Sequence, residues 1–378
     1  MTAVPETRRE PTTAVPQTRQ HPLLRILLTL LAVALGVLGL VAVGWLLLVF
    51  VIVPPVEVVT LSVVVLAILV VAGSVAVVVR SNDAAALSRN DKITLGLMVG
   101  IPTAILTVFI LVPMVASLTL SLTSWNGIGG LDKIQFIGLK NYVDLHQVYK
   151  PFYPALTHNL IWLLFFIFIA TPLGMFLAVL LDKNIRGTRF YQSALYMPVV
   201  LSLAIVGFIW MLIYAPEQGL LNNILGTNRQ GNLISWLGDP SLNLWAVLVA
   251  ASWRHVGYVM VLYLAGLKAV DPTLREAASI DGANERQTFF RVVFPVLKPI
   301  NIVVIVITVI ESLRAFDLAF IVNKGLNGLE LLSTLVTNNI IGETSRIGFG
   351  SAIAVVLLTL SVVPIVIYLS RALREENA

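Results

Sequence analysis

The sequence predicts an all-α membrane protein with about eight transmembrane helices, and three observations lead to this fold class. Hydrophobic residues make up 58% of the 378 residues and charged residues only 12%, whereas soluble domains hold about 45–50% apolar and about 25% charged residues. Apolar runs recur that are long enough to cross a bilayer core about 30 Å thick as a helix. Lys and Arg gather on one side of these runs, as they do in membrane proteins of fixed orientation.

The N-terminal part is expected to hold a tail and a helical hairpin. Residues 1–22 are rich in Pro, Thr, Arg and Glu without an apolar period, which is typical of a disordered segment. Residues 23–53 and 56–79 would form a transmembrane hairpin that turns at Pro54 and Pro55. The first of these segments is too long for the apolar region of a cleaved signal peptide.

Six further apolar segments would form a core within residues 93–375. Their expected bounds are 93–120, 160–181, 190–214, 242–267, 300–323 and 349–370. With the N-terminus placed in the cytoplasm, most Lys and Arg residues outside the segments fall on the inner side. The distribution therefore predicts a multi-pass protein of the cytoplasmic membrane with both termini inside.

The composition excludes several classes of site. The chain has no cysteine and only 4 histidines, and no two histidines have metal-ligand spacing, so we expect no disulfide, thiolate or zinc site. The net charge of +5 is explained by topology, so nucleic acid is not an expected partner. No Gly-Lys dipeptide occurs, which excludes a phosphate-binding loop of the usual form.

Residues 271–299, on the expected cytoplasmic side, carry the signals of two short helices. Asp271 suits the N-cap of the first, with Pro272 at its first position, and Gly282 suits its C-terminal end. A helix–turn–helix is therefore expected on the membrane face.

The second short helix would begin at Asn284, with Gln287 as the partner in a capping box. Pro295 would end this helix or kink the chain into the next segment.

The side chains of this loop suit a protein partner. Ala277 and Ala278 would let another surface approach closely, and Glu276 and Asp281 offer carboxylates to a basic partner. Phe289 and Phe290 offer apolar anchors. The alternative is a solvated loop that only joins two membrane segments.

The loop resembles the EAA loop of binding-protein-dependent ABC importer permeases. The matching residues are Glu276-Ala277-Ala278, Gly282, Val292, Phe294 and Pro295, and Asp281-Gly282-Ala283 is similar to the carbohydrate, maltose-type branch. Further similar elements follow in the family's order: 136–142, Tyr196-Met197-Pro198, 207–210, 265–267 and Phe316-Asp317. Residues 323–330 look most like the α-glucoside type.

The resemblance implies a sugar-importer subunit that is not itself an enzyme. It implies that the loop docks on a dimer of ATP-binding subunits, and that ATP and Mg are bound in those partners while this chain needs no cofactor. The other implied partners are a second permease subunit, an extracytoplasmic solute-binding protein and membrane lipid.

Ionisable residues inside membrane segments are costly and are candidates for a substrate path. Arg254 and His255 lie within 242–267, and Glu311, Arg314 and Asp317 lie within 300–323. The spacing of Glu311 and Arg314 allows an ion pair on one helix face, either as a structural pair or as part of the path.

Aromatic and amide side chains complete the candidate path. Trp253, Tyr258 and Tyr263 could lie against sugar rings or serve as packing residues. Asn159 could cap its own helix or contact the substrate.

Two other functions stay open from the residues. An ion-coupled secondary transporter could use Glu311, Asp317 and His255 as a proton relay, although no internal repeat of the kind common in that class is evident. The chain could also be an ABC permease for a solute other than a sugar.

Overall fold

The computed structural model describes residue 73 and residues 89–376, except 130–132, 184, 228–231 and 343–344. The predicted tail 1–22, and all of the predicted hairpin 23–79 but Gly73, lie outside the described residues. Contacts divide the chain into two compact units, Met1–Ala116 and Ser117–Ala378.

Within the described residues the secondary structure is helical, with one isolated β-bridge between Thr123 and Phe136. The elements, with η marking π-helical turns, are α3 Arg89–Leu106, η2 Thr107–Leu111, α4 Val112–Leu120, α5 Lys140–Gln147, α6 Phe152–Phe165, η4 Phe166–Ala170, α7 Thr171–Asp182, α8 Thr188–Val200, α9 Leu203–Ile213, α10 Leu220–Leu225, α11 Asn243–Ala269, α12 Pro272–Ile280, α13 Glu285–Thr288, η5 Phe289–Val293, α14 Phe294–Val296, α15 Lys298–Leu313, α16 Asp317–Asn323, α17 Leu332–Ile340 and α18 Ile347–Glu376.

Four continuous helical stretches of the described residues are long and apolar enough to cross a membrane. They are Ile93–Leu120, Phe152–Asp182, Asn243–Ala269 and Ile347–Tyr368. Two bent helix pairs raise the number of candidate spans to six if each pair is one span. The predicted helical fold is thus confirmed for the described residues, with four to six candidate spans. The two further spans predicted at the N-terminus fall, apart from Gly73, on residues that are not described.

The two bent pairs correct the expectation of straight segments. The predicted segment 190–214 turns by 104° between α8 and α9, because Leu201 is extended and Ser202 caps a new helix by accepting from the Ile205 N–H. The predicted segment 300–323 is interrupted between Leu313 and Asp317, where α15 ends and α16 begins.

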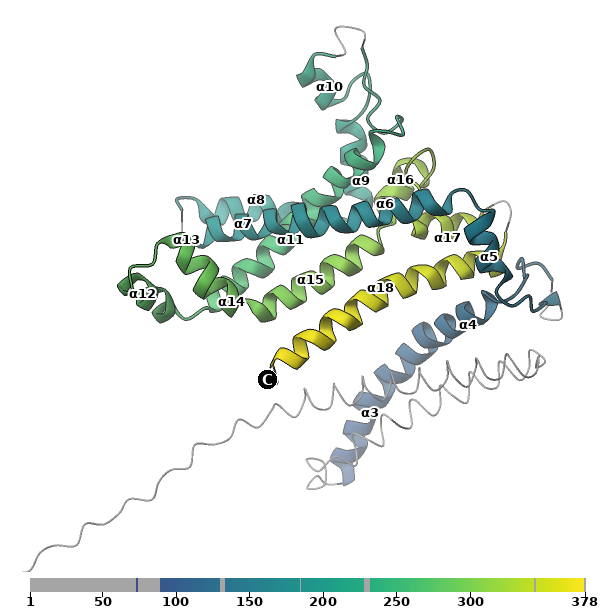
Figure 1. Ribbon diagram of the computed structural model, residues 1–378, viewed down its shortest axis with the longest axis horizontal. Helices are drawn as coiled ribbons and strands as arrows, with labels where there is room; N and C mark the ends of the chain where they lie inside the picture. The colour runs from purple at the N-terminus through teal and green to yellow at the C-terminus, as the bar shows by residue number, and fades with distance from the viewer. Residues whose placement is uncertain are drawn as a thin grey trace, which may run out of the picture. The chain divides into compact units, whose positions relative to one another are not determined.

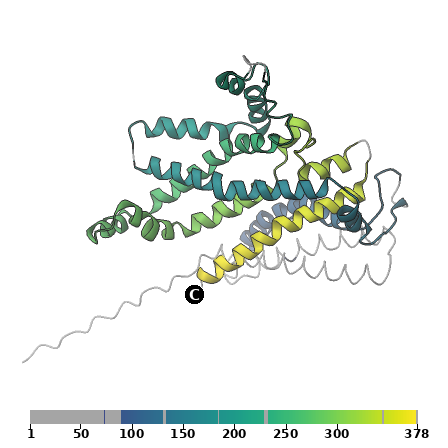
Figure 2. The ribbon, with the colours of Figure 1, turned by 45° about the horizontal axis from the view of Figure 1, so that its top comes forward.

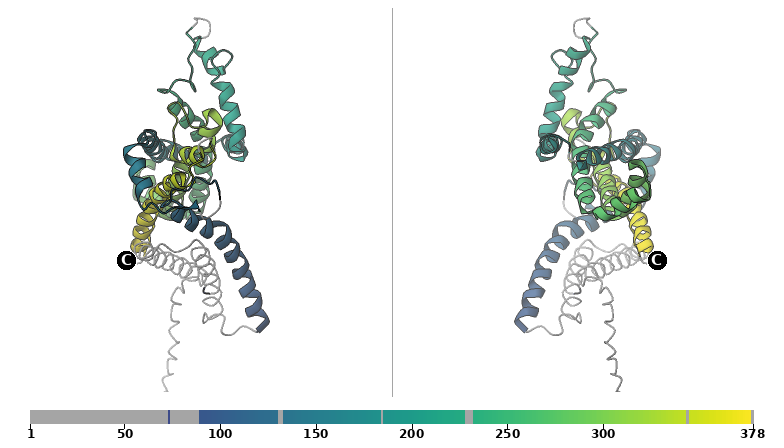
Figure 3. Two further views of the ribbon diagram at one scale, coloured as in Figure 1. Left: turned by 90° about the vertical axis from the view of Figure 1, so that its right-hand side faces the viewer. Right: turned by 90° about the vertical axis from the view of Figure 1, so that its left-hand side faces the viewer.

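In the larger unit, α11 is the central helix. It packs against α7 and α8, while α15 packs against α6 and α18, and these helices lie side by side in Figures 1 and 2. In the most apolar part of α11, 61% of the residues are buried, against 28% or less in the other three continuous stretches. Helices α9 and α10 project from this bundle, as the side views show (Figure 3).

Glycines allow the close approach of helices to α11. A Cβ on Gly257 would lie 2.3 Å from the Leu195 carbonyl oxygen of α8, and one on Gly174 of α7 would lie 2.9 Å from the Val256 carbonyl oxygen. Backbone meets backbone at both positions, so no larger residue fits without separating the helices.

Three π-helical turns share one cause. Each is followed, two residues after its end, by a proline: Pro113 after η2, Pro172 after η4 and Pro295 after η5. A proline ring clashes with the carbonyl four residues earlier in an α-helix. The π turn widens the helix at that carbonyl, and the residue before each proline donates its N–H five residues back.

Candidate functional site

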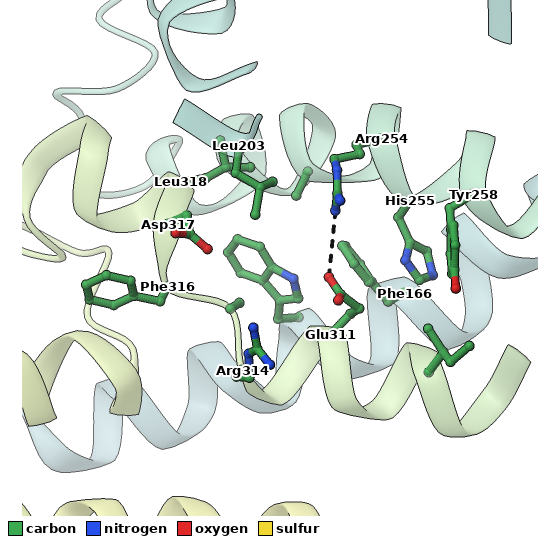
Figure 4. Close-up of a pocket in the computed structure, with 14 residues that line it drawn as sticks. Phe166, Leu203, Arg254, His255, Tyr258, Glu311, Arg314, Phe316, Asp317 and Leu318 are labelled. Carbon is green, nitrogen blue, oxygen red and sulfur yellow. Dashed lines mark ion pairs between the residues drawn. The ribbon is translucent and has the colours of Figure 1, made fainter. Parts of the chain in front are cut away.

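A pocket of about 350 Å³ lies in the larger unit where α6, α11 and the interruption between α15 and α16 meet. Six residues predicted for the substrate path line it: Arg254, His255, Tyr258, Glu311, Arg314 and Asp317. Figure 4 shows these side chains around one space, with Arg254 and Glu311 on opposite sides of it. Residues that the sequence places 53 to 63 positions apart therefore form one polar site.

The ion pair in the pocket differs from the expected one. Arg254 Nη1 lies 3.9 Å from Glu311 Oε2 and joins α11 to α15, and no ion pair joins Glu311 to Arg314 in the part of the chain that the structure describes. Arg314 is the C-cap residue just beyond the end of α15 at Leu313. Residues three apart are neighbours only while both are helical, so the predicted Glu311–Arg314 pair is wrong.

His255 is held by hydroxyl groups rather than by carboxylates. Its Nε2 lies 3.3 Å from Thr308 Oγ1 and 3.5 Å from Thr171 Oγ1, and the two hydroxyl oxygens are 3.1 Å apart. The ring is 5% exposed and lies 4.4 Å from the Phe166 ring, centroid to centroid. These contacts join α7, α11 and α15 at the wall of the pocket.

Two aromatic candidates, Trp253 and Tyr263, lie outside the pocket. Trp253 makes an edge contact with Trp210 on α9, at 6.0 Å between ring centroids. Tyr263 is 3% exposed and packs in an apolar cluster of α7 and α11. Both side chains pack against other parts of the described chain, and neither lines the pocket.

Asn159 has a role that the sequence did not indicate. Its Oδ1 accepts from the Leu332 N–H at 2.9 Å, and its Nδ2 donates to the Leu313 carbonyl at 3.4 Å. The side chain is 1% exposed. It neither caps its own helix nor lines the pocket, but joins the end of α15 to the start of α17.

Aromatic rings that were not predicted also line the pocket. Trp162 and Phe166, four residues apart along α6 and η4, and Phe316 at the helix interruption contribute to its wall. The spacing of Trp162 and Phe166 places them on one helix face, but the same spacing occurs throughout apolar helices and does not single them out.

The loop of residues 271–299 forms the two predicted short helices. Asp271 accepts from the Thr273 N–H at 2.9 Å and caps α12, and this hydrogen bond holds the pKa of the Asp271 carboxyl below its usual value. At the other end, Gly282 has a φ of +79°, and the Ala283 N–H donates to the Ala278 carbonyl. This is the glycine-terminated end that the local rules predict.

The capping box of the second helix is also present. Asn284 and Gln287 each accept from the other's backbone N–H at 2.9 Å. Pro295 does not end the helix at once, because η5 is followed by α14, which reaches Val296 before the chain bends by 75° into α15.

The outer face of the loop is only partly as expected. Glu276, Ala277, Asp281 and Phe290 are exposed. Ala278 is 7% exposed, and Phe289 packs against the cluster beneath the loop. Ala278 and Phe289 therefore face the protein beneath the loop and do not belong to its exposed surface.

Residues 170–375, more than half of the chain, match the family described as binding-protein-dependent transport system inner membrane component. The chain belongs to this family. The resemblance noted in the loop of residues 271–299 is thereby confirmed, and the ion-coupled secondary transporter is not supported. The permease is a multi-pass membrane protein and a transport subunit rather than an enzyme.

Known proteins similar to the permease agree with this assignment. It is 31% identical over 265 residues to a xylose/arabinose import permease protein of Haloferax volcanii, covering 69% of this chain and 82% of the relative. It is 31% identical over 276 residues to a probable starch degradation products transport system permease protein of Thermoanaerobacterium thermosulfurigenes, covering 72% of this chain and 91% of the relative.

The fold is shared with a solved transporter. A chain from the crystal structure of a bacterial ABC transporter involved in the import of the acidic polysaccharide alginate superposes with a TM-score of 0.65. The match covers 76% of the permease and 96% of that chain, at 20% sequence identity. The interrupted, bent helices of the larger unit therefore belong to a known architecture.

Proposed function

We propose that the permease carries a sugar or oligosaccharide into the cell as one subunit of an ATP-driven importer. The pocket is the observation that carries this proposal, because it combines charged hydrogen-bonding groups with aromatic rings. Sugar hydroxyls need such donors and acceptors, and the apolar faces of sugar rings pack on aromatic side chains. The relatives named for xylose and arabinose and for starch degradation products favour the same substrate class.

The proposed substrate contacts are Arg254, Tyr258, Glu311, Arg314 and Asp317. His255 would stabilise the side of the pocket through its contacts with Thr171 and Thr308. The Arg254–Glu311 pair spans 3.9 Å, and these side chains are 31% and 46% exposed. A pair this open leaves lone pairs and N–H groups for hydroxyl groups of a ligand.

The energy is proposed to enter through the loop of α12 and α13. Glu276, Ala277, Asp281, Gly282 and Phe290 would form the surface that a dimer of ATP-binding subunits contacts, with ATP and Mg bound in that dimer. A second permease subunit would complete the membrane pore, and an extracytoplasmic solute-binding protein would deliver the sugar. Both termini of the permease would then lie in the cytoplasm.

Uptake by the reconstituted complex tests the proposal. The permease would be co-expressed with candidate partner subunits, placed in proteoliposomes containing ATP, and offered labelled mono- and oligosaccharides with the binding protein. We expect uptake that requires ATP and the binding protein, and Glu311→Gln is expected to raise the half-maximal sugar concentration about tenfold, because a charged hydrogen bond is worth about 1.5 kcal/mol or more.

The matched control is Glu217→Gln, which removes a charge from an exposed site outside the pocket. Uptake driven by an ion gradient without ATP would reject the proposal. An unchanged half-maximal concentration for Glu311→Gln would reject Glu311 as a substrate contact.

A further inference from the structure

The C-terminal end of α7 is tied to the loop by a cluster of three charged residues, Asp182, Lys268 and Arg275, here named the Asp182 junction. Arg275 Nη1 of α12 lies 2.7 Å from Asp182 Oδ2, and Lys268 Nζ of α11 lies 3.1 Å from Asp182 Oδ1. Arg275 Nη2 also donates to the Leu267 carbonyl near the end of α11, at 3.3 Å. One carboxylate thus joins three helices.

The position of Asp182 makes it depend on its two cations. It is the last residue of α7, where the negative end of the helix dipole disfavours a carboxylate. Its side chain is only 10% exposed, so hydration by water can replace little of the electrostatic stabilisation that the two cations give the carboxylate. The side chains of Lys268 and Arg275 are 50% and 37% exposed, so the carboxylate is the buried partner of both pairs. Leaving this carboxylate without a cation is more costly than leaving an exposed carboxylate without one.

A second ion pair nearby provides the contrast. Lys183, the next residue along the chain, lies 2.6 Å from Glu285 at the start of α13, and these side chains are 52% and 85% exposed. This pair joins the same two regions of the molecule, but it is open to water and screened by salt. The main difference lies in the carboxylates, since the side chain of Asp182 is 10% exposed and that of Glu285 is 85% exposed.

We propose that the Asp182 junction is the mechanical connection through which a displacement of α12 moves α7 and α11. Both helices reach the pocket region: Arg254 and His255 lie on α11, and Thr171, which bonds His255, begins α7. The inference rests on the proposed function, because it assigns the route from the ATPase-contacting loop to the substrate pocket. Asp182, Lys268 and Arg275 are positioning residues and touch no substrate.

The test measures sugar transported per ATP hydrolysed in the reconstituted complex. For Asp182→Asn and Arg275→Gln we expect this ratio to fall about tenfold, within the usual range of coupling between two sites, while the subunits still co-purify and hydrolyse ATP. The double variant should be no worse than either single one, since both remove the same contact. Asp182→Glu, which keeps the charge, should retain most of the coupling, and the control Glu285→Gln should retain all of it.

A reversible crosslink keeps the test independent of folding defects. The chain has no cysteine, so an Asp182→Cys, Arg275→Cys double variant has two thiols in this subunit. A short bis-methanethiosulfonate reagent, which joins each thiol to the linker through a disulfide and releases methanesulfinate, should restore the sugar-to-ATP ratio, and a reductant that cleaves both disulfides should remove it again in the same sample.

The proposal is overturned if the ratio is unchanged in Asp182→Asn and Arg275→Gln, if the crosslink restores nothing, or if the variants only lose subunits from the complex. A wild-type complex without ATP-driven uptake would instead be a failure of the proposed function, so the two outcomes are distinguishable.

Discussion

At the scale of single residues, Asn159 shows how one amide can stabilise a helix interruption. It serves two backbone groups, the Leu313 carbonyl and the Leu332 N–H, that would otherwise be buried without these partners. Asn159→Ala is expected to destabilise the fold, because a buried backbone group left unpaired costs about 1–3 kcal/mol. The measurement is thermal unfolding of the purified permease in detergent.

The control for this prediction is Gln218→Ala, an exposed residue whose loss should change the melting temperature little. Equal melting temperatures for Asn159→Ala and the wild type would show that the two backbone groups find other partners, and would remove the stated role of Asn159.

The polar candidates of the pocket were largely predictable, and their pairing was not. Charged residues in apolar segments are rare enough to be conspicuous, which is why Arg254, Glu311, Arg314 and Asp317 could be selected from the sequence. The Arg254–Glu311 pair forms because α11 and α15 are neighbours, and helix neighbours cannot be read from a single sequence. The role of Asn159 depends on the same missing information.

At the scale of helices, the packing of α8 on α11 depends on Gly257. A Cβ there would lie 2.3 Å from the Leu195 carbonyl oxygen, and a backbone atom cannot rotate away as a side chain does. Gly257→Ala is therefore expected to destabilise the fold by about 1–3 kcal/mol, as overpacking in a dense core does. Protein yield and thermal unfolding in detergent would show it.

A substitution on the exposed side of the same helix, Ala265→Val, provides the comparison for Gly257→Ala. If both variants unfold at the wild-type temperature, the two helices can separate without cost and the close contact is not needed for stability.

The ends of helices were more predictable than their interiors. Asp271, Gly282 and the Asn284–Gln287 box follow local hydrogen-bonding rules that act within a few residues. The turn at Leu201 and Ser202 and the interruption before Asp317 were missed, because an average of hydropathy over a window does not depend on the direction of the backbone.

At the scale of the whole molecule, the charge distribution predicts an orientation that labelling can measure. Single cysteines can be placed in the cysteine-free chain at Ser279, on the exposed face of α12, and at Asn232, in the exposed segment after α10. A membrane-impermeant thiol reagent should reach the cysteine at 279 only from the cytoplasmic side and that at 232 only from the outside.

Right-side-out and inverted vesicles supply the two sides for this experiment, and detergent-permeabilised vesicles show that both sites react. The reverse pattern would contradict the predicted orientation and, with it, the docking of the loop on cytoplasmic ATP-binding subunits.

The π-helical turn η4 has a consequence for the permitted length of this membrane segment. A residue occupies about 100° of an α-helical turn, and η4 holds its extra residue between Trp162 and Thr171. Deleting one residue from 166–170 would convert the π turn into α-helix and keep Trp162 and Thr171 on nearly the same helix faces, but it would return the ring of Pro172 to a clash with the carbonyl four residues earlier. The extra residue and Pro172 therefore depend on each other, and a relative that lacks one of the two in an alignment is expected to lack the other as well.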